Sequence, residues 1–224
     1  PRGTSVLAFD PLPARPPRSL AGLRRHLSLL APGAGDPVPG AFHGGFLGAL
    51  AYELGAAAER GLRLPRDPWA LAPIVGGLFT DFLVRDEARG ETFLVLGERP
   101  GDGRASVSRR ARALRTTLLA PAELEPCRPR GALRRLVPRA VYRRRIERVR
   151  ALIAAGEVYQ VNLSHRLERP LTGEPFELYR RLRALHPAPY AAYLRGASCA
   201  LLSASPELLL EFGPEPGARA LARP

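Results

Sequence analysis

Residues 138–169 read PRAVYRRRIERVRALIAAGEVYQVNLSHRLER, and the spacing of the apolar residues changes within this stretch. Pro138 can start a helix and Gly156 can end it. Three apolar residues fall on one face of that helix: Ile146, Val149 and Ile153. From residue 157 to 169 apolar and polar residues alternate instead, which predicts a strand. The sequence therefore places a helix and a strand next to each other in one segment.

Helix and strand patterns continue on both sides of this stretch. Amphipathic helices are predicted over residues 19–30 and from Pro175 onward, and an arginine-rich surface helix over residues 106–119. Strands are predicted at residues 5–9, 72–85, 91–97, 190–195 and 198–203. Since the two patterns mix without strict alternation, we predict an α+β fold with mixed or antiparallel sheets flanked by helices.

Residues 121–138 separate two differently patterned regions of the chain. They hold four prolines and show no clean period, as a linker does. We therefore predict a first region over residues 1–120, a linker over 121–137 and a second region over 138–224. No internal repeat marks the chain as a solenoid or an array.

The chain carries a formal net charge of +13, but its basic residues reflect composition more than a polyanionic partner. All 34 are arginine, methionine is absent, and asparagine and glutamine occur once each. A coding sequence strongly biased toward G and C produces this pattern without selection for charge. We therefore predict no nucleic-acid partner. The absence of methionine also predicts that the chain begins inside a longer protein or is processed.

An arginine-rich nucleic-acid-binding module is the alternative from another functional class. Five arginines of the predicted helix would carry that function: Arg143, Arg144, Arg145, Arg148 and Arg150. No aromatic residues interleave with them to stack on bases, and the same helix has an apolar stripe that can face a core. A solvated helix face is the simpler interpretation.

The cysteines and histidines do not form a pattern of metal ligands. Cys127 and Cys199 are far apart in sequence, and the histidines are scattered: His26, His43, His165 and His186. We predict reduced cysteines and no metal site within this sequence. No run of about 18 apolar residues is present to cross a bilayer, and the first residues lack the apolar core of a signal peptide. The expected location is the cytoplasm, with no membrane partner.

The only glutamine and the only asparagine of the chain, Gln160 and Asn162, occupy alternate positions of the predicted strand. With Ser164 they would share one face of it. One interpretation is a solvent-facing strand side. The other is that the two amides are needed there for function, because an exposed face in this chain more often carries arginine or glutamate.

Ser205-Pro206-Glu207 has two interpretations from the residues alone. Serine as N-cap, proline at the first helical position and an acid in the first turn together predict the start of a helix. However, residues 208–212 are short and apolar before Gly213. If they form a strand, Glu207 lies at a strand junction, where a partly buried carboxyl group can be kept protonated for acid catalysis.

Four motifs resemble, in order and spacing, the signatures of the chorismate-binding component I family, which includes anthranilate synthase and aminodeoxychorismate synthase. Residues 154–164 (AAGEVYQVNLS), 186–194 (HPAPYAAYL) and 203–209 (SASPELL) resemble the family's G-D-x-Y-Q-V-N-L-S, N-P-S-P-Y-A-A-Y-L and S-P-E-R-F. Residues 44–53 (GGFLGALAYE) resemble its G-G-W-V-G-Y-L-x-Y-D/E. The resemblance implies an incomplete anthranilate synthase component I-type fold. The first region then lacks its first strand, and the second begins the catalytic region.

The resemblance also implies roles for individual residues. The glutamate of the S-P-E motif, here Glu207, is the general acid that protonates the leaving ring hydroxyl of magnesium-bound chorismate. At Gln160, isochorismate- and salicylate-forming relatives carry a lysine that activates water. Glutamine cannot act as that base, so the resemblance implies ammonia as the nucleophile. Further implied roles are substrate binding at Asn162 and Ser205 and a tryptophan-type pocket at Pro189 and Tyr190.

We predict a fragment, roughly the first half, of aminodeoxychorismate synthase component I, which converts chorismate and ammonia to 4-amino-4-deoxychorismate for folate synthesis. Residues 52–55 (YELG) favour this branch over the alternative, anthranilate synthase component I of the tryptophan pathway. The implied partner is a glutamine amidotransferase subunit that supplies ammonia. The implied cofactor is Mg²⁺, whose ligands are expected beyond Pro224, so the fragment alone is expected to be inactive.

Overall fold

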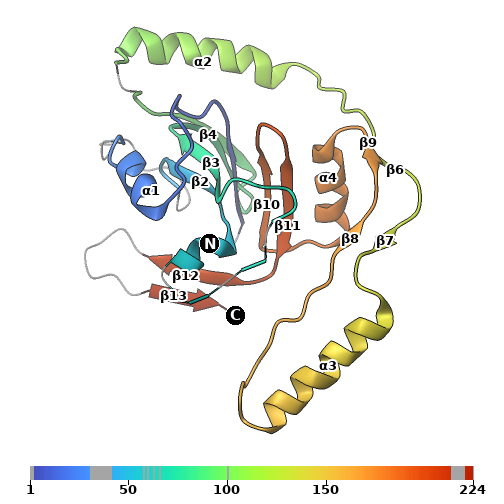
Figure 1. Cartoon of the computed structure of the whole chain (residues 1–224). Helices are drawn as coiled ribbons and strands as arrows, with labels where there is room; N and C mark the ends of the chain where they lie inside the picture. The colour runs from blue at the N-terminus through green and yellow to red at the C-terminus, as the bar shows by residue number, and fades with distance from the viewer. Residues whose placement is uncertain are drawn as a thin grey trace. The chain divides into compact units, whose positions relative to one another are not determined.

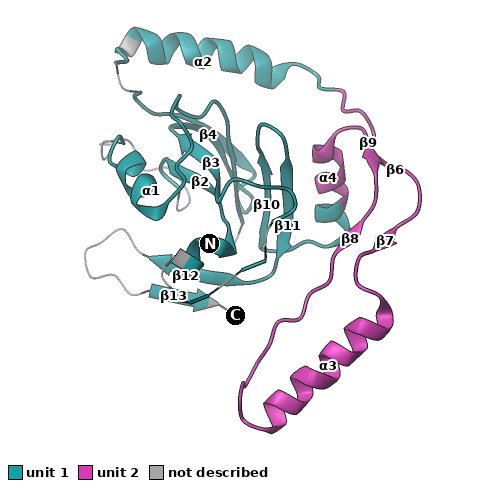
Figure 2. Cartoon of the chain, in the orientation of Figure 1, with its two compact units in different colours: residues 1–122, 182–224 teal, residues 123–181 magenta. Residues whose placement is uncertain are grey.

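The computed structural model describes residues 3–30, 42–99 without 58, 60, 63 and 66, 101–212 and 220–223. The glycine- and proline-rich stretch 31–40, which is predicted to follow the first helix, lies outside these residues. The chain divides into two compact units, drawn in teal and magenta in Figure 2. Unit 1 contains residues 1–122 and 182–224, and unit 2 contains residues 123–181.

A three-stranded antiparallel sheet forms one part of unit 1. Its order is β1 (Thr4–Ala8), β4 (Asp81–Asp86) and β5 (Glu91–Leu96), with β4 in the centre. Because β4 pairs on both sides, its side chains are the most buried of the sheet, and Phe82 and Val84 are each 1% exposed. The predicted strands at 5–9 and 91–97 are therefore confirmed.

A two-stranded ladder of β2 (Gly45–Leu50) and β3 (Ile74–Phe79) forms a second sheet of unit 1. Gly48 pairs with Gly76, and a Cβ atom on Gly76 would lie 2.3 Å from the Leu47 carbonyl oxygen. Glycine is required at this crossing because the two backbones approach closely there. A short 3₁₀ helix, η1 (Tyr52–Ala57), follows β2.

The single strand predicted over residues 72–85 is wrong in one respect, since the structure has two strands there. β3 ends at Phe79 and β4 begins at Asp81, and each strand pairs in a different sheet. The continuous apolar pattern hides the break because both strands bury side chains, among them Ile74 and Leu78 in β3.

The helices predicted over residues 19–30 and 106–119 are both found in unit 1. The first, α1 (Leu20–Leu27), is capped by Ser19, whose Oγ accepts a hydrogen bond of 3.1 Å from the Gly22 amide. The second is α2 (Arg104–Leu119), which Figure 1 shows in green. It is joined to β4 by an ion-pair cluster around Asp81, a carboxylate with no exposed surface.

The C-terminal part of unit 1 consists of two antiparallel ladders. β10 (Tyr190–Arg195) pairs with β11 (Ala200–Ser205), and the Gly196 amide donates a 2.8 Å hydrogen bond to the Cys199 carbonyl at the turn. β12 (Leu208–Phe212) pairs with β13 (Ala220–Arg223) through an irregular register. β10 also contacts β3, so this ladder packs on the second sheet of unit 1.

Unit 2 is built around two helices and two short ladders. Its elements are α3 (Arg139–Ala154), most of α4 (Pro175–Leu185), and the paired strands β6 (Arg128–Pro129) with β9 (Leu171–Thr172) and β7 (Arg134–Arg135) with β8 (Leu167–Glu168). Pro138 precedes α3 and Gly156 follows it with a positive φ of 74°, as the sequence predicts. The start of a helix at Pro175 is likewise confirmed.

The predicted strand over residues 157–169 is wrong. Only Leu167–Glu168 forms a strand there, and the preceding residues back to the end of α3 are irregular. The alternating pattern is present, but a strand also needs a partner, and no described segment forms a ladder with residues 157–166.

Every strand pairing among the described residues is antiparallel, and helices flank the sheets, which confirms the predicted α+β class. In the contact-based division, residues 182–224 belong to the same unit as residues 1–122. The proposed division into 1–120, 121–137 and 138–224 stays a prediction.

Candidate functional site

Ser205 organises the turn that leads from β11 into β12. Its hydroxyl donates to the Glu207 carbonyl at 3.2 Å and accepts from the Glu207 amide at 3.3 Å. Pro206 between them has no amide hydrogen to compete for the hydroxyl. In the β10–β11 ladder Ser205 stands opposite Tyr190. The structure thus brings Pro189, Tyr190, Ser205 and Glu207 together at one end of this ladder.

The strand interpretation of Glu207 is confirmed and the helix-cap interpretation is wrong, because β12 begins directly after it at Leu208. The expected partial burial of Glu207 is not found, since its side chain is exposed. Tyr190 and Ser205 are half-buried, whereas Pro189 is exposed. An acid at this position can reach a bound molecule, but the described residues do not enclose it.

Gln160 and Asn162 lie in unit 2, on the irregular segment that follows α3. Both side chains are exposed, and Tyr159 beside them is 93% exposed. Because the segment is not a strand in the structure, Gln160 and Asn162 do not share the face of a strand. Gln160 and Glu207 belong to different units, and their meeting at one substrate stays a prediction.

Tyr142 is a residue that the motif comparison missed. It lies in the first turns of α3, and its hydroxyl donates a 3.1 Å hydrogen bond to the Leu163 carbonyl, next to Asn162. Its ring meets the His165 ring edge to face, with centroids 4.9 Å apart. The available signal was its spacing, four residues before Ile146 on the apolar face of the helix.

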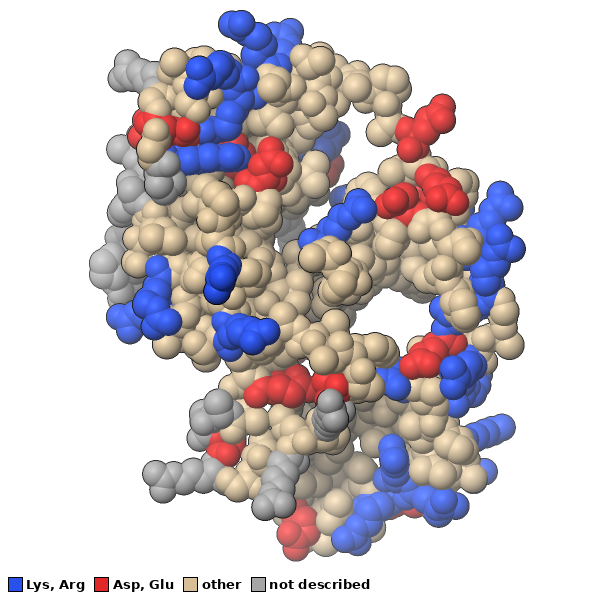
Figure 3. Space-filling model, turned by 45° about the horizontal axis from the view of Figure 1, so that its top comes forward, with Lys and Arg blue, Asp and Glu red and all other residues tan. Residues whose placement is uncertain are grey.

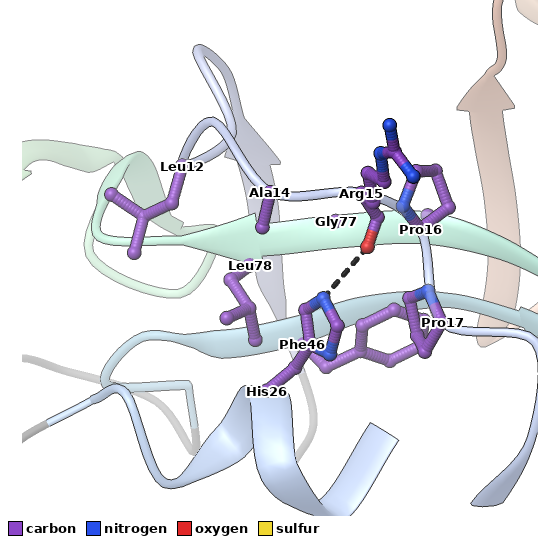
Figure 4. A pocket seen from close by; sticks show the side chains of 10 residues that line it. Leu12, Ala14, Arg15, Pro16, Pro17, His26, Phe46, Gly77 and Leu78 are labelled. Atoms are coloured by element: carbon purple, nitrogen blue, oxygen red, sulfur yellow. Dashed lines mark hydrogen bonds between the residues drawn. The ribbon is translucent and has the colours of Figure 1, made fainter. Parts of the chain in front are cut away.

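A small pocket in unit 1 contains none of the predicted site residues. Its lining residues are Leu12, Ala14, Arg15, Pro16, Pro17, His26, Phe46, Gly76, Gly77 and Leu78. The His26 ring on its wall, seen in Figure 4, is engaged at both nitrogens, with the Arg15 carbonyl at 2.7 Å and the Gly22 carbonyl at 2.9 Å. The two nitrogens of His26 are therefore not free to bind a ligand in this pocket.

Charged groups do not assemble a metal centre in the part of the chain that the structure describes. No group of three His, Cys, Asp or Glu side chains there could hold a metal ion. The implied Mg²⁺ therefore finds no ligand set among these residues. No described helix is long and apolar enough to span a membrane.

The arginine side chains occur in several separate groups on the face shown in Figure 3, with acidic side chains between some of them. The five arginines of the nucleic-acid alternative are exposed on α3, a placement that both interpretations of that helix predict.

A local hydrogen-bond network in unit 1 stabilises the ionised carboxylate of Asp102. Hydrogen bonds from Ser106 and Arg110 lower the pKa of Asp102 from 3.8 to about 2.

Comparison with known proteins decides the family. The family model described as chorismate binding enzyme matches residues 15–224. The chain belongs to the chorismate-binding enzyme family. Within this family, anthranilate synthase component 1 of Streptomyces coelicolor is 36% identical, and the match covers 92% of this chain and 43% of that protein. Anthranilate synthase component 1 of Thermus thermophilus is 35% identical, and that match covers 99% of this chain and 45% of that protein.

One further relative and one solved structure extend the comparison. Aminodeoxychorismate synthase component 1 of Bacillus subtilis is 27% identical over 75% of this chain and 37% of that protein. The crystal structure of anthranilate synthase component I from Streptococcus pneumoniae superposes with a TM-score of 0.80 at 19% identity. That match covers 96% of this chain and 52% of the solved one, and it confirms the predicted fold. The chain spans less than half the length of the curated relatives.

Proposed function

We propose that the protein acts as component I of an anthranilate synthase, which joins ammonia to chorismate. The observation that carries this proposal is the Ser205-Pro206-Glu207 turn, placed by β10 and β11 in a chain of the chorismate-binding family. The turn presents an acid at a strand junction, with its backbone fixed by the serine hydroxyl. Glu207 is the proposed general acid.

In the proposed reaction, a carbon–nitrogen bond forms as ammonia attacks the ring and a ring carbon–oxygen bond breaks. Glu207 gives its proton to the departing oxygen, which leaves as water and not as hydroxide. The nitrogen of the adduct then loses its extra proton to the Glu207 carboxylate, which restores the acid. Anthranilate forms when the adduct loses a ring hydrogen as a proton and its enolpyruvyl side chain leaves as pyruvate, so that chorismate and ammonia give anthranilate, pyruvate and water. Asn162 and Ser205 are the proposed contacts to the substrate, and Pro189 and Tyr190 the proposed wall of a tryptophan-type pocket.

Ammonia is favoured over water as the nucleophile because Gln160 cannot remove a proton from water. Its amide can instead hydrogen-bond a neutral nucleophile or the substrate. A glutamine amidotransferase subunit is the proposed source of ammonia. Mg²⁺ is proposed as the cofactor on family grounds alone, and a cytoplasmic location likewise stays a prediction.

Aminodeoxychorismate synthase component I is the second candidate. Residues 52–55 and the 27% identical relative from Bacillus subtilis support it. The relatives named anthranilate synthase are more similar, at 36% and 35% identity, so they support the tryptophan branch over the folate branch. The product distinguishes the two candidates, because only one of them releases anthranilate.

Glu207→Gln tests the acid in the protein expressed from its complete reading frame and assayed with chorismate, magnesium chloride and ammonium chloride. Removing a general acid lowers kcat by about 10²–10⁴-fold, so we expect a loss in that range. Glu211→Gln is the matched control, since Glu211 lies four residues further on in β12. Equal rates for both variants would rule out Glu207 as the acid.

A further inference from the structure

Tyr142 shares one face of α3 with the apolar residues Ile146, Val149 and Ile153. No residue of this helix is fully buried, and Ile146 and Ile153 are 39% and 43% exposed. Tyr142 is half-buried, and its hydroxyl donates a hydrogen bond to the segment that follows the helix. Among the described residues of this face, Tyr142 is therefore the side chain that is hydrogen-bonded to this segment.

The segment is fixed at its two ends by backbone hydrogen bonds. At its start the Glu157 amide donates to the Leu152 carbonyl at 3.0 Å. Near its end the Leu136 amide donates to the Arg166 carbonyl at 3.1 Å, just before the β7–β8 ladder. Figure 1 shows the segment running from the end of α3 back to β8.

Between these ends the backbone has few partners. Within the described part of the chain, residues 158–162 make no hydrogen bond to another backbone group. Among the hydrogen bonds made by described side chains, the bond from the Tyr142 hydroxyl to the Leu163 carbonyl lies nearest in sequence to Gln160 and Asn162. Since Leu163 directly follows Asn162, fixing its carbonyl limits the positions that both amides can take.

We propose that Tyr142 is a positioning residue that holds Gln160 and Asn162 in place for the amination of chorismate. The proposal rests on the proposed function for the role of the two amides. The hydroxyl fixes the carbonyl of Leu163, and the ring contact to His165 fixes the chain two residues further on. Tyr142 touches no reacting atom and acts through the segment alone.

Tyr142→Phe tests the hydroxyl, because it keeps the ring beside His165 and removes the hydrogen bond. Tyr52→Phe is the matched control, since it makes the same chemical change at a side chain that is 86% exposed in η1. In the protein expressed from its complete reading frame, we expect Tyr142→Phe to lower kcat/KM for ammonia about fivefold to tenfold. Tm should stay near its original value. KM for chorismate should rise less than kcat/KM for ammonia falls, because Ser205, the other proposed contact to the substrate, is not held by Tyr142.

A double-mutant cycle separates positioning from a general structural effect. If Tyr142 acts through the two amides, adding Tyr142→Phe to a variant with both Gln160→Ala and Asn162→Ala should lower kcat/KM for ammonia no further. Full additivity of Tyr142→Phe with the two amide changes would overturn the proposal. So would a Tyr142→Phe variant that loses Tm and affects both substrates equally.

Limited proteolysis tests the role of Tyr142 without an activity assay. Its failure can therefore be told apart from failure of the proposed function. Chymotrypsin can cut after the exposed Tyr159, and release of the segment should speed that cut about fivefold in Tyr142→Phe but not in Tyr52→Phe. If cleavage rates are unchanged, Tyr142 does not hold the segment and the inference is wrong. If cleavage rises while the original protein aminates no chorismate, the proposed function fails, and with it the assignment of the held amides to amination.

Discussion

Tyr190 stands directly opposite Ser205 in the antiparallel β10–β11 ladder, and the Ser205 hydroxyl bonds to both backbone groups of Glu207. One side chain therefore links the end of the ladder to the candidate acid. The ladder fixes the position of Ser205, and Ser205 fixes the turn. Ser205 therefore fixes the backbone from which the exposed Glu207 side chain extends.

Ser205→Ala removes both hydrogen bonds to Glu207. We expect kcat to fall by about tenfold, because the acid is no longer held in place. The free energy of unfolding should fall by only about 1 kcal/mol, since the lost bonds lie at an exposed turn. Steady-state kinetics and urea unfolding measure the two effects, and Ser205→Thr, which keeps a hydroxyl, should recover much of the rate. A Thr variant as slow as the Ala variant would contradict this role.

Asp81 is the buried centre of the ion-pair cluster that joins α2 to β4. Its carboxylate has no exposed surface and lies 2.8 Å from an Arg99 nitrogen and 3.1 Å from an Arg110 nitrogen. Asp81→Asn leaves both guanidinium groups without that charge, so we expect the free energy of unfolding to fall by about 3 kcal/mol. Urea unfolding checks the value, with the exposed Glu91→Gln as control. A loss no greater than the control's would show that the cluster is not important for stability.

The Asp102 carboxylate gives the fold an acid-sensitive component. Its pKa is about 2 in the folded protein against an ordinary 3.8, because Ser106 and Arg110 donate hydrogen bonds to the ionised form. A lowered folded-state pKa stabilises the fold above about pH 4, and this contribution is lost as the pH falls from about 4 to 2. Unfolding free energies measured across that range should fall less steeply in Asp102→Asn than in the unchanged protein. Parallel curves would show that Asp102 contributes nothing.

Local signals explain which elements the sequence predicts well. Ser19 caps α1, Pro138 precedes α3 and Gly156 follows it, and each acts through neighbouring residues alone. The period of the apolar residues adds the apolar face of α1, α3 and α4. Helix positions can therefore be predicted from short stretches of sequence.

Strands depend on partners that are distant in sequence, and the errors occur there. Residues 157–169 alternate as a strand does, yet only Leu167–Glu168 finds a partner, at Arg134–Arg135. The turn at Glu207 could be interpreted in two ways, because the strand that follows is specified by pairing of Leu208 with Arg223. Exposure of Glu207 was likewise not predictable, since burial depends on what other segments cover.

The identity of the product tests the central claim most directly, because it shows whether ammonia is the nucleophile. The protein from the complete reading frame, incubated with chorismate, magnesium chloride and isotopically labelled ammonium chloride, should release anthranilate that carries the nitrogen label, as measured by mass spectrometry. Labelled 4-amino-4-deoxychorismate would keep the amination chemistry and move the protein to the second candidate. Isochorismate or salicylate without nitrogen, or no conversion of chorismate, would contradict the assignment of this chain to an aminating chorismate enzyme.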